Sequence, residues 1–203
     1  MYIPKHFNLS ERTRQLEFIE KNGFGDLVTC LDNQLQINQA PFLLDESKQY
    51  LLCHLAKMNS HWQTIEQVDD LTVCFKGPDC YISPSWNSNP NNVPTWNYVS
   101  VQVSGKATLM NDAELVELLE KLSGKHEAQF DNPWTVDKMD EKKFTAMRRA
   151  IVGIKISIDA IEAKAKLSQN KSESDFNELI NGLAKQTDSD SQKVLELMLS
   201  TRK

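Results

Sequence analysis

Alternating apolar and polar positions recur in several stretches of the chain up to residue 167, and this period of two is the mark of a β-strand. The clearest case is 97–110, where Val99, Val101 and Val103 alternate with polar residues. The pattern predicts a half-buried antiparallel strand in which Gly105 forms a bulge or bend. The same reasoning predicts further strands at residues 26–31, 35–44, 49–56, 71–77, 79–84 and 150–167, the first two of which form a hairpin that turns at Asp32 and Asn33.

Helices are expected where apolar residues recur every three to four positions. Leu16 and Ile19 share one face of a first helix that Ser10 caps and Gly23 ends. Trp62 and Ile65 are expected to point inward from a short helix. We therefore predict helices at residues 11–22, 57–68 and 112–126, and two short ones after residue 172 that separate near 187–188.

These elements predict the fold class. Six or seven antiparallel strands with scattered helices, and no alternation of strand and helix, favour a mainly β, α+β protein built on a closed or nearly closed barrel. We prefer a barrel to a sandwich. The expected division is a barrel domain at 1–171 and a C-terminal helical tail at 172–203, whose helices pack outside the barrel.

Composition narrows the classes of function. The 203 residues are 40% hydrophobic and 25% charged, as in an ordinary soluble domain. A net charge of −5 disfavours strong non-specific DNA binding without excluding a local basic patch. The chain has no apolar run of membrane-span length and no signal-peptide core at its start, so we expect a cytoplasmic protein. The four cysteines and four histidines lack metal-site spacing; we expect no metal and buried free thiols.

The first candidate site is HLAKMNSHW, residues 54–62, where a strand meets a short helix. Backbone N–H groups and the positive end of a helix favour an anion at such a junction, and a phosphate would fit. The side chains that would donate to it are His54, Lys57, Asn59, Ser60 and His61. The alternative is a capped surface helix with a solvated lysine.

The second candidate site is the long loop YISPSWNSNPNNVPTWNY, residues 81–98. Flat aromatic rings interleaved with hydroxyls and amides suit a heteroaromatic ligand with carbonyl edges. The alternative is a hydrophobic plug in which Trp86 and Trp96 cover one end of the barrel. The residues predicted to line a ligand pocket here are Ser83, Trp86, Thr95, Trp96, Asn97 and Tyr98.

A third polar segment, KLSQNKS at 166–172, directly follows the last predicted strand. Its candidate binding residues are Lys166, Ser168, Gln169 and Asn170. The alternative is a polar turn before a helix, with Ser172 or Ser174 as the N-cap. The chain shows no Ser/His/Asp order, P-loop or GxGxxG, so we predict no catalytic residue.

These segments together resemble the PaiB family of FMN-binding-type negative transcriptional regulators. The similarity runs nearly end to end, and the motifs that carry it are MYIPKHF, FGDLVT, HLAKMNSHW, GPDCYISPSW, VPTWNYVSVQVSGK, IVGIKISI and KLSQNKS. The resemblance implies a split β-barrel of the pyridoxamine-phosphate-oxidase type, a homodimer with flavin sites at the subunit interface, and FMN as cofactor. DNA as a partner is implied by the resemblance alone.

One departure from the fold's flavin-using oxidases concerns the phosphate. They place an arginine beside a lysine at the junction, whereas this chain has Lys57 and then Asn59. That implies weaker FMN binding, or added cations such as Lys166 or Lys171 from a partner chain. We expect the valines at 99, 101 and 103 and the strand from Ile151 to supply dimer surface.

Three functions follow from the sequence. The first is a PaiB-like regulator with an FMN-type pocket. The alternatives are a flavin-dependent oxidoreductase, and an interaction protein whose pocket is vestigial. The sequence leaves open whether the protein is an enzyme.

Overall fold

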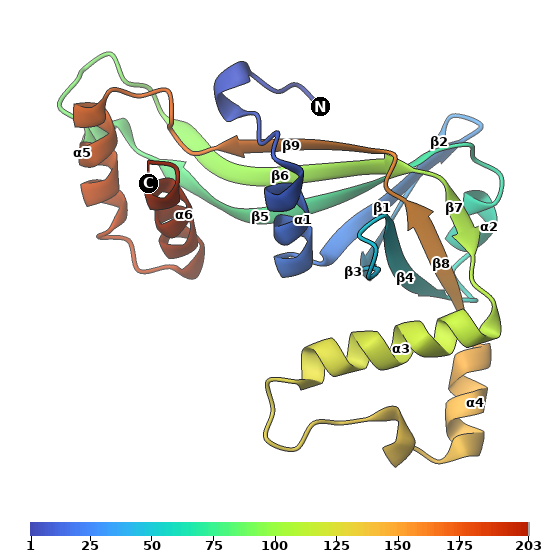
Figure 1. The fold of residues 1–203 in the computed structure, drawn as a ribbon. Coiled ribbons are helices and arrows are strands. Elements are labelled where there is room, and N and C mark those ends of the chain that lie inside the picture. Colours follow the sequence, from blue (N-terminus) through green and yellow to red (C-terminus); the bar gives the residue numbers. More distant parts are fainter. Residues whose placement is uncertain (203) are drawn as a thin grey trace. The chain divides into compact units, whose positions relative to one another are not determined.

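The computed structural model describes residues 1–202, an α+β protein (Figure 1). The chain forms two compact units, which are described separately. Unit 1 comprises Met1–Phe18, Phe75–Gln102 and the chain from Glu162, and unit 2 comprises Ile19–Cys74 and Val103–Ile161.

The strands form two sheets. They are β1 (Phe24–Leu31), β2 (Gln34–Pro41), β3 (Leu43–Leu44), β4 (Tyr50–Ala56), β5 (Leu71–Ile82), β6 (Thr95–Gly105), β7 (Ala107–Leu109), β8 (Ile151–Ser157) and β9 (Ala160–Lys166). One sheet has the order β2-β1-β5-β6-β9 and the other β3-β4-β8-β7. Strands β5, β6 and β9 contribute residues to both units.

Helices precede, connect and follow the strands along the chain. The α-helices are α1 (Arg12–Lys21), α2 (His61–Ile65), α3 (Asp112–Glu127), α4 (Glu141–Arg149), α5 (Glu173–Leu183) and α6 (Ser189–Ser200), and the 3-10 turns are η1 (Lys5–Phe7), η2 (Pro84–Trp86) and η3 (Val136–Lys138). The predicted α+β class, with antiparallel strands and peripheral and C-terminal helices, is confirmed. No helix among residues 1–202 is both long and apolar enough to cross a membrane.

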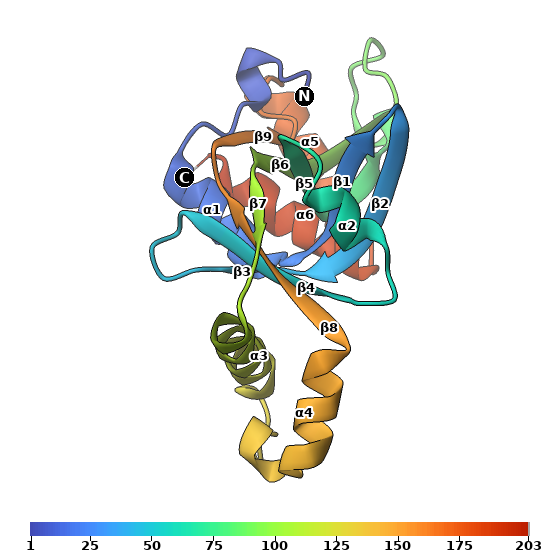
Figure 2. The same cartoon turned by 90° about the vertical axis from the view of Figure 1, so that its right-hand side faces the viewer.

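Unit 2 holds the β1–β2 hairpin and the four-stranded sheet. The hairpin turns at Asp32 and Asn33, as predicted, and both have positive φ values of 51° and 62°, which short polar side chains tolerate. Helix α3 packs its buried leucines on this sheet, where Leu118 and Leu122 meet Leu43. Figure 2 shows α3 and α4 extending from the end of strands β7 and β8.

Unit 1 holds the C-terminal helices, and both begin with a side-chain cap. Ser172 accepts a hydrogen bond from Asp175 N, and Asp188 accepts one from Ser191 N, which satisfies free N–H groups at each helix start. The predicted separation near 187–188 is therefore correct. Helices α5 and α6 contact each other (Figure 1), and each contains buried residues, among them Leu183 and Val194. The domain division at 171/172 stays a prediction.

Two strand predictions were wrong. The stretch from 71 to 84 contains one strand, β5, rather than two. Its buried residues are Leu71, Val73 and Phe75 and then Cys80 and Ile82, so the buried positions change from odd to even numbers. A shift of one residue is what a β-bulge produces. The alternation of buried and exposed positions restarts at this shift, and in the sequence the restart looks like the beginning of a new strand.

The stretch 150–167 shows the opposite error, because it contains two strands in different sheets. It bends between β8 and β9, where Asp159 N donates to Ser104 O. The predicted bend at Gly105 is confirmed: a Cβ there would lie 1.7 Å from the Ser157 carbonyl oxygen, so no other residue fits.

The predicted surface roles of several apolar residues also need correction. Val99, Val101 and Val103 are at most 3% exposed, so they cannot supply dimer surface; in β8, Ile154 and Ile156 are fully buried, whereas Ile151 and Val152 are half-buried. The prediction for the thiols was half right. Cys53 and Cys80 are buried, and burial raises the pKa of both, that of Cys80 to about 11. Cys30 is exposed and Cys74 half-buried.

Candidate functional site

The segment His54–His61 lies in unit 2, where its most polar members are used inside the fold. His61 is buried, and its Nε2 lies 2.8 Å from Thr29 Oγ1 while its Nδ1 lies 2.8 Å from Asn38 Nδ2. Asn59 Nδ2 in turn donates to Asn38 Oδ1 at 2.9 Å. Helix α2 therefore begins with a residue that is anchored on the β1–β2 hairpin, and Ile65, rather than the half-buried Trp62, is its fully inward apolar residue.

The hydrogen bonds fix the tautomer of His61. The backbone N–H of His61 donates to Asn59 Oδ1 at 3.0 Å, which orients both Asn59 and, through it, Asn38. Asn38 then presents its NH₂ group to Nδ1, so Nδ1 accepts and Nε2–H donates to Thr29. Burial lowers the pKa of His61, in agreement with a neutral ring. A neutral ring that donates to Thr29 cannot also remove that hydroxyl's proton.

The remaining members of the segment differ in accessibility. His54 is half-buried, its Nδ1 has no hydrogen-bond partner within the described chain, and burial lowers the pKa of its ring. Lys57 and Ser60 are exposed. Within residues 1–202 neither side chain makes a hydrogen bond. Of the five predicted phosphate ligands, Lys57 and Ser60 are therefore the available donors.

In unit 1, the turn 166–170 uses much of its polar chemistry to hold its own shape. Gln169 accepts from Leu167 N at 2.8 Å and donates to Ala165 O. Ser168 has a positive φ of 62° and exchanges hydrogen bonds with the buried Asn97. The alternative interpretation of this segment, a polar turn before a helix that Ser172 caps, therefore accounts for Ser168 and Gln169. Asn170 is exposed, and within residues 1–202 its side chain makes no hydrogen bond that holds the turn.

The lysines of this region are placed differently: Lys164 and Lys166 lie on the outward face of β9, and Lys171, beyond the end of that strand, donates from Nζ to Asn92 Oδ1. Lys166 Nζ donates to Thr95 Oγ1 and to Trp96 O. Lys164 lies 5.3 Å from the ring centre of Tyr98 and 5.7 Å from that of Tyr2. Desolvation, followed by the charges of Lys164 and Lys171, lowers the pKa of Lys166. None of these three lysines takes part in an ion pair within the described residues.

Aromatic rings surround these cations. Trp96 and Tyr98 alternate with buried residues of β6, and the Trp96 ring meets Tyr81 of β5 edge to face, with ring centres 6.1 Å apart. Tyr2, Trp96 and Tyr81 are 82%, 52% and 45% exposed, so these rings are accessible to a ligand. We call this set the aromatic–cationic surface; its members are Tyr2, Tyr81, Trp96, Tyr98, Lys164, Lys166 and Lys171.

Sequence reasoning missed Tyr2, Tyr81 and Lys164 as members of this surface. The signal was present, because Lys164 and Lys166 alternate with buried alanines and so share one face of their strand. Which other residues share that face depends on strand pairing, which the sequence did not reveal.

Ser83 and Trp86 do not join this surface. Ser83 Oγ accepts from Ser85 N and caps η2. Trp86 packs on α5 so closely that a Cβ at Gly182 would lie 2.3 Å from its ring. Asn87 and Ser88 add hydrogen bonds to Asp175 O and to the Glu178 carboxylate. This part of the loop holds helix α5. Trp86 therefore has a packing role, as in the plug interpretation, whereas Trp96 does not.

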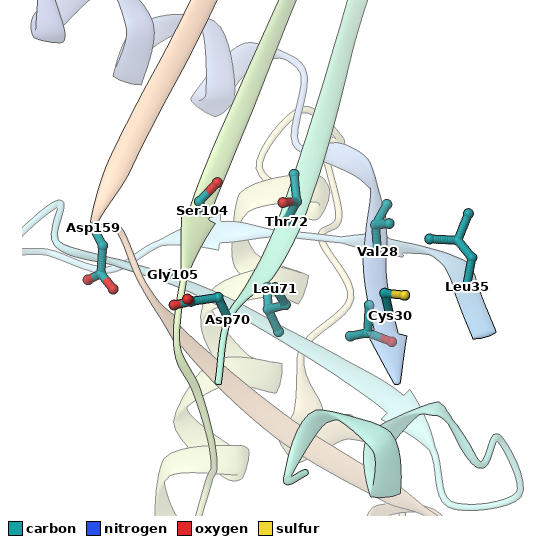
Figure 3. A pocket seen from close by; sticks show the side chains of 10 residues that line it. Val28, Cys30, Leu35, Asp70, Leu71, Thr72, Ser104, Gly105 and Asp159 are labelled. Atoms are coloured by element: carbon teal, nitrogen blue, oxygen red, sulfur yellow. The ribbon is translucent and has the colours of Figure 1, made fainter. Parts of the chain in front are cut away.

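A separate cavity of about 420 Å³ lies in unit 2 (Figure 3). Figure 3 shows Asp159 and Asp70 on one side of it and Cys30 and Leu35 of the hairpin on the other. Among the described residues that line it there is no lysine or arginine. Two carboxylates without a cation do not fit a phosphate dianion. Nor do any three His, Cys, Asp or Glu side chains in residues 1–202 gather as a metal-binding group.

Comparison with known proteins places the chain in a family. A family model described as "Putative FMN-binding domain" matches residues 1–160. The protein "Protease synthase and sporulation protein PAI 2" of Bacillus subtilis is 37% identical over 200 residues, which cover 98% of this chain and 96% of that protein.

Two solved structures share the fold at low identity. The FAD and heme binding protein from Mycobacterium smegmatis is 12% identical with a TM-score of 0.59, and the match covers 77% of this chain and 72% of that one. The flavocytochrome Anf3 from Azotobacter vinelandii is 10% identical with a TM-score of 0.60, covering 95% and 78%. The split-barrel fold implied by the sequence motifs is confirmed, and the chain belongs to the PaiB family of the FMN-binding-domain class.

Proposed function

We propose that the protein is a PaiB-type regulator that binds FMN, and that the aromatic–cationic surface of unit 1 holds it. The observation that carries the proposal is the contact set around Lys166: cations without carboxylate partners beside the exposed ring of Trp96 and the half-buried ring of Tyr98. An isoalloxazine ring requires a flat apolar surface, and its phosphate requires cations. The family's description as an FMN-binding domain supports the same ligand.

The roles of the residues follow from their positions. The rings of Trp96 and Tyr98 would stack on the flavin, Thr95 and Lys166 would donate to its polar edge, and Lys164 or Lys171 would contact the phosphate. Asn97, Ser168 and Gln169 hold the turn that positions Lys166, so they act through it. Bound FMN would supply one- and two-electron redox chemistry. A regulator would need only the binding of FMN.

Lys57 and Ser60 of unit 2 form a second proposed phosphate contact, because they are the available donors of the His54–His61 segment. The two sets can be separated by matched variants. Losing a charge-assisted phosphate contact costs about 1.5–3 kcal/mol, or roughly 10- to 150-fold in affinity. Whichever of Lys57→Ala and the double variant Lys164→Ala/Lys171→Ala weakens FMN binding by this factor identifies the phosphate site. If neither does, both assignments are wrong.

The homodimer is also part of the proposal, with a different surface from the one expected. The outward face of the β1–β2 hairpin carries Phe24, Leu35 and Ile37, which are 64%, 62% and 55% exposed. β2 is an edge strand of its sheet, and exposed apolar edges of this kind are covered in stable proteins. We propose that a second copy covers it by twofold symmetry. Light scattering should show a dimer that Ile37→Lys converts to monomer.

Fluorescence titration with FMN tests the binding proposal directly. Flavin at the aromatic–cationic surface should strongly quench tryptophan emission, and Trp96→Phe should remove part of that quenching, whereas Trp134→Phe in unit 2 should not. Unchanged emission at saturating FMN would reject the proposal. If bound flavin is reduced by a nicotinamide donor at a catalytic rate, the oxidoreductase alternative replaces the regulator.

A further inference from the structure

The aromatic–cationic surface has an excess of positive charge that one bound flavin does not explain. Three lysines lie along it, and the carboxylates closest to it along the strands are already engaged. Glu162 of β9 accepts from the N-terminal amine of Met1 at 2.9 Å, and Asp79 of β5 pairs with Lys76 at 2.7 Å. In a chain of net charge −5, this face keeps unpaired cations.

The rings on this surface are spread over several places. Tyr81 and Trp96 lie on β5 and β6 with their rings edge to face, while the ring centres of Tyr98 and Tyr2 lie 5.3 and 5.7 Å from Lys164 Nζ. Tyr2, Trp96 and Tyr81 are exposed and Tyr98 is half-buried, so at least three of these rings can each receive a flat group. The lysines near these rings are placed to contact anionic groups that link one flat group to the next.

Nucleic acid matches this pattern when it is single-stranded. Every base has a π-face that stacks on an aromatic ring, and the phosphates between bases seek lysine. In a duplex the faces of the bases are stacked on each other, so rings that lie on a sheet cannot reach them. The preference for unpaired bases therefore follows from the exposed rings, and the preference for an anion from the lysines.

We propose that the aromatic–cationic surface binds single-stranded nucleic acid, with bases on Trp96, Tyr98 and Tyr81 and phosphates on Lys164, Lys166 and Lys171. This goes beyond the proposed flavin binding and does not require it. If both hold, FMN and the strand compete for the same rings.

Fluorescence anisotropy of a labelled oligothymidylate of about 12 nucleotides, a length within the range of single-strand sites, tests the proposal. The single strand should bind more tightly than the matched duplex. Trp96→Ala should weaken binding about 5- to 100-fold, as expected for one lost stacking contact, and Trp96→Phe should restore most of it. With three lysine–phosphate contacts, log affinity should fall against log salt with a slope of about −2.

Two control variants separate this surface from general stickiness. Trp134→Ala and Lys142→Gln remove an exposed ring and an exposed cation from unit 2, and neither should change the affinity. Circular dichroism checks that each variant is folded. Equal affinity for duplex and single strand, no binding by the wild type, or an unaffected Trp96→Ala would each overturn the proposal.

The same titrations keep the two proposals distinguishable. Strand binding without FMN binding would leave this inference standing and reject the flavin. FMN binding without strand binding would do the reverse. Where both ligands bind, displacement of the labelled strand by FMN would show that they share the surface.

Discussion

The segments 54–61 and 166–172 look alike in sequence but are used in opposite ways by the fold. Each contains lysine, asparagine and serine directly after a strand. In the first, His61 and Asn59 turn inward and join Thr29 and Asn38 in a closed network, which leaves only an exposed lysine and serine. In the second, Ser168 and Gln169 hold the turn while the lysines face outward among aromatic rings.

The difference shows that a cluster of donors in a sequence indicates binding only when the fold leaves the donors unsatisfied. A histidine with both nitrogens bonded inside the protein has nothing left for a ligand. A lysine that has no carboxylate partner and lies beside exposed rings can still bind a ligand. The following experiments test whether the first segment serves stability and the second serves binding.

The largest effect on stability should come from His61→Ala. It leaves a cavity and removes the partners of Thr29 and Asn38, so we expect a loss of about 3 kcal/mol in the free energy of unfolding. Urea denaturation measures it. Lys57→Ala in the same segment should change stability by less than about 0.5 kcal/mol, because its side chain is exposed. Equal losses in the two variants would show that the network does not stabilise the fold.

A smaller loss is expected from the turn of unit 1. Asn97→Ala removes the partner of Ser168 Oγ, and leaving a buried hydroxyl unpaired costs about 1–3 kcal/mol. Lys166→Gln should leave stability nearly unchanged while it weakens ligand binding. The comparison fails if Lys166→Gln unfolds the protein as readily as Asn97→Ala does.

Two glycines within helices provide a matched pair of substitutions. Gly182→Ala should lower stability by about 1–2 kcal/mol, because the new methyl collides with Trp86 and this outweighs the gain in helix propensity. Gly124→Ala in α3 meets nothing within 4 Å and should raise stability by about 0.5–1 kcal/mol. Thermal unfolding of both variants checks the signs, and a stabilised Gly182→Ala would mean that Trp86 does not pack on α5.

The smallest effect concerns pH. Burial holds the pKa of His61, and that of His54, below the ordinary value of 6.5. The unfolded chain then binds more protons, so stability is full above about pH 6.5 and falls as pH drops through the folded-state pKa. Nuclear magnetic resonance of the imidazole should show a proton on Nε2 of His61 at neutral pH. A ring protonated on Nδ1 would contradict the network.

Local patterns in the sequence predicted most of the elements. The hairpin turn at Asp32–Asn33, helix α3 and the two tail helices each depend on neighbours a few residues apart, and all were correct. The errors at 71–84 and 150–167 arose where a strand changes its buried face or its sheet. Both depend on distant strands, which alternation alone does not record.

The candidate site was less predictable for the same reason. The segment motifs pointed to Trp96, Tyr98 and Lys166, which the structure brings together. Tyr2 and Tyr81 join them only through pairing between strands far apart in the chain. That His61 is buried depends on Thr29 and Asn38, which come from the hairpin, so the composition of residues 54–61 could not reveal it.

The change of buried face within β5 has a consequence for how the sequence can vary. Deleting one residue near Gly77–Pro78 would turn either Phe75 or Ile82 to the opposite side of the strand, and unit 1, which contains both residues, would lose part of its interior. Substitutions can be absorbed on either side of that point, but insertions and deletions cannot. Length at this position should therefore be constrained more tightly than residue identity.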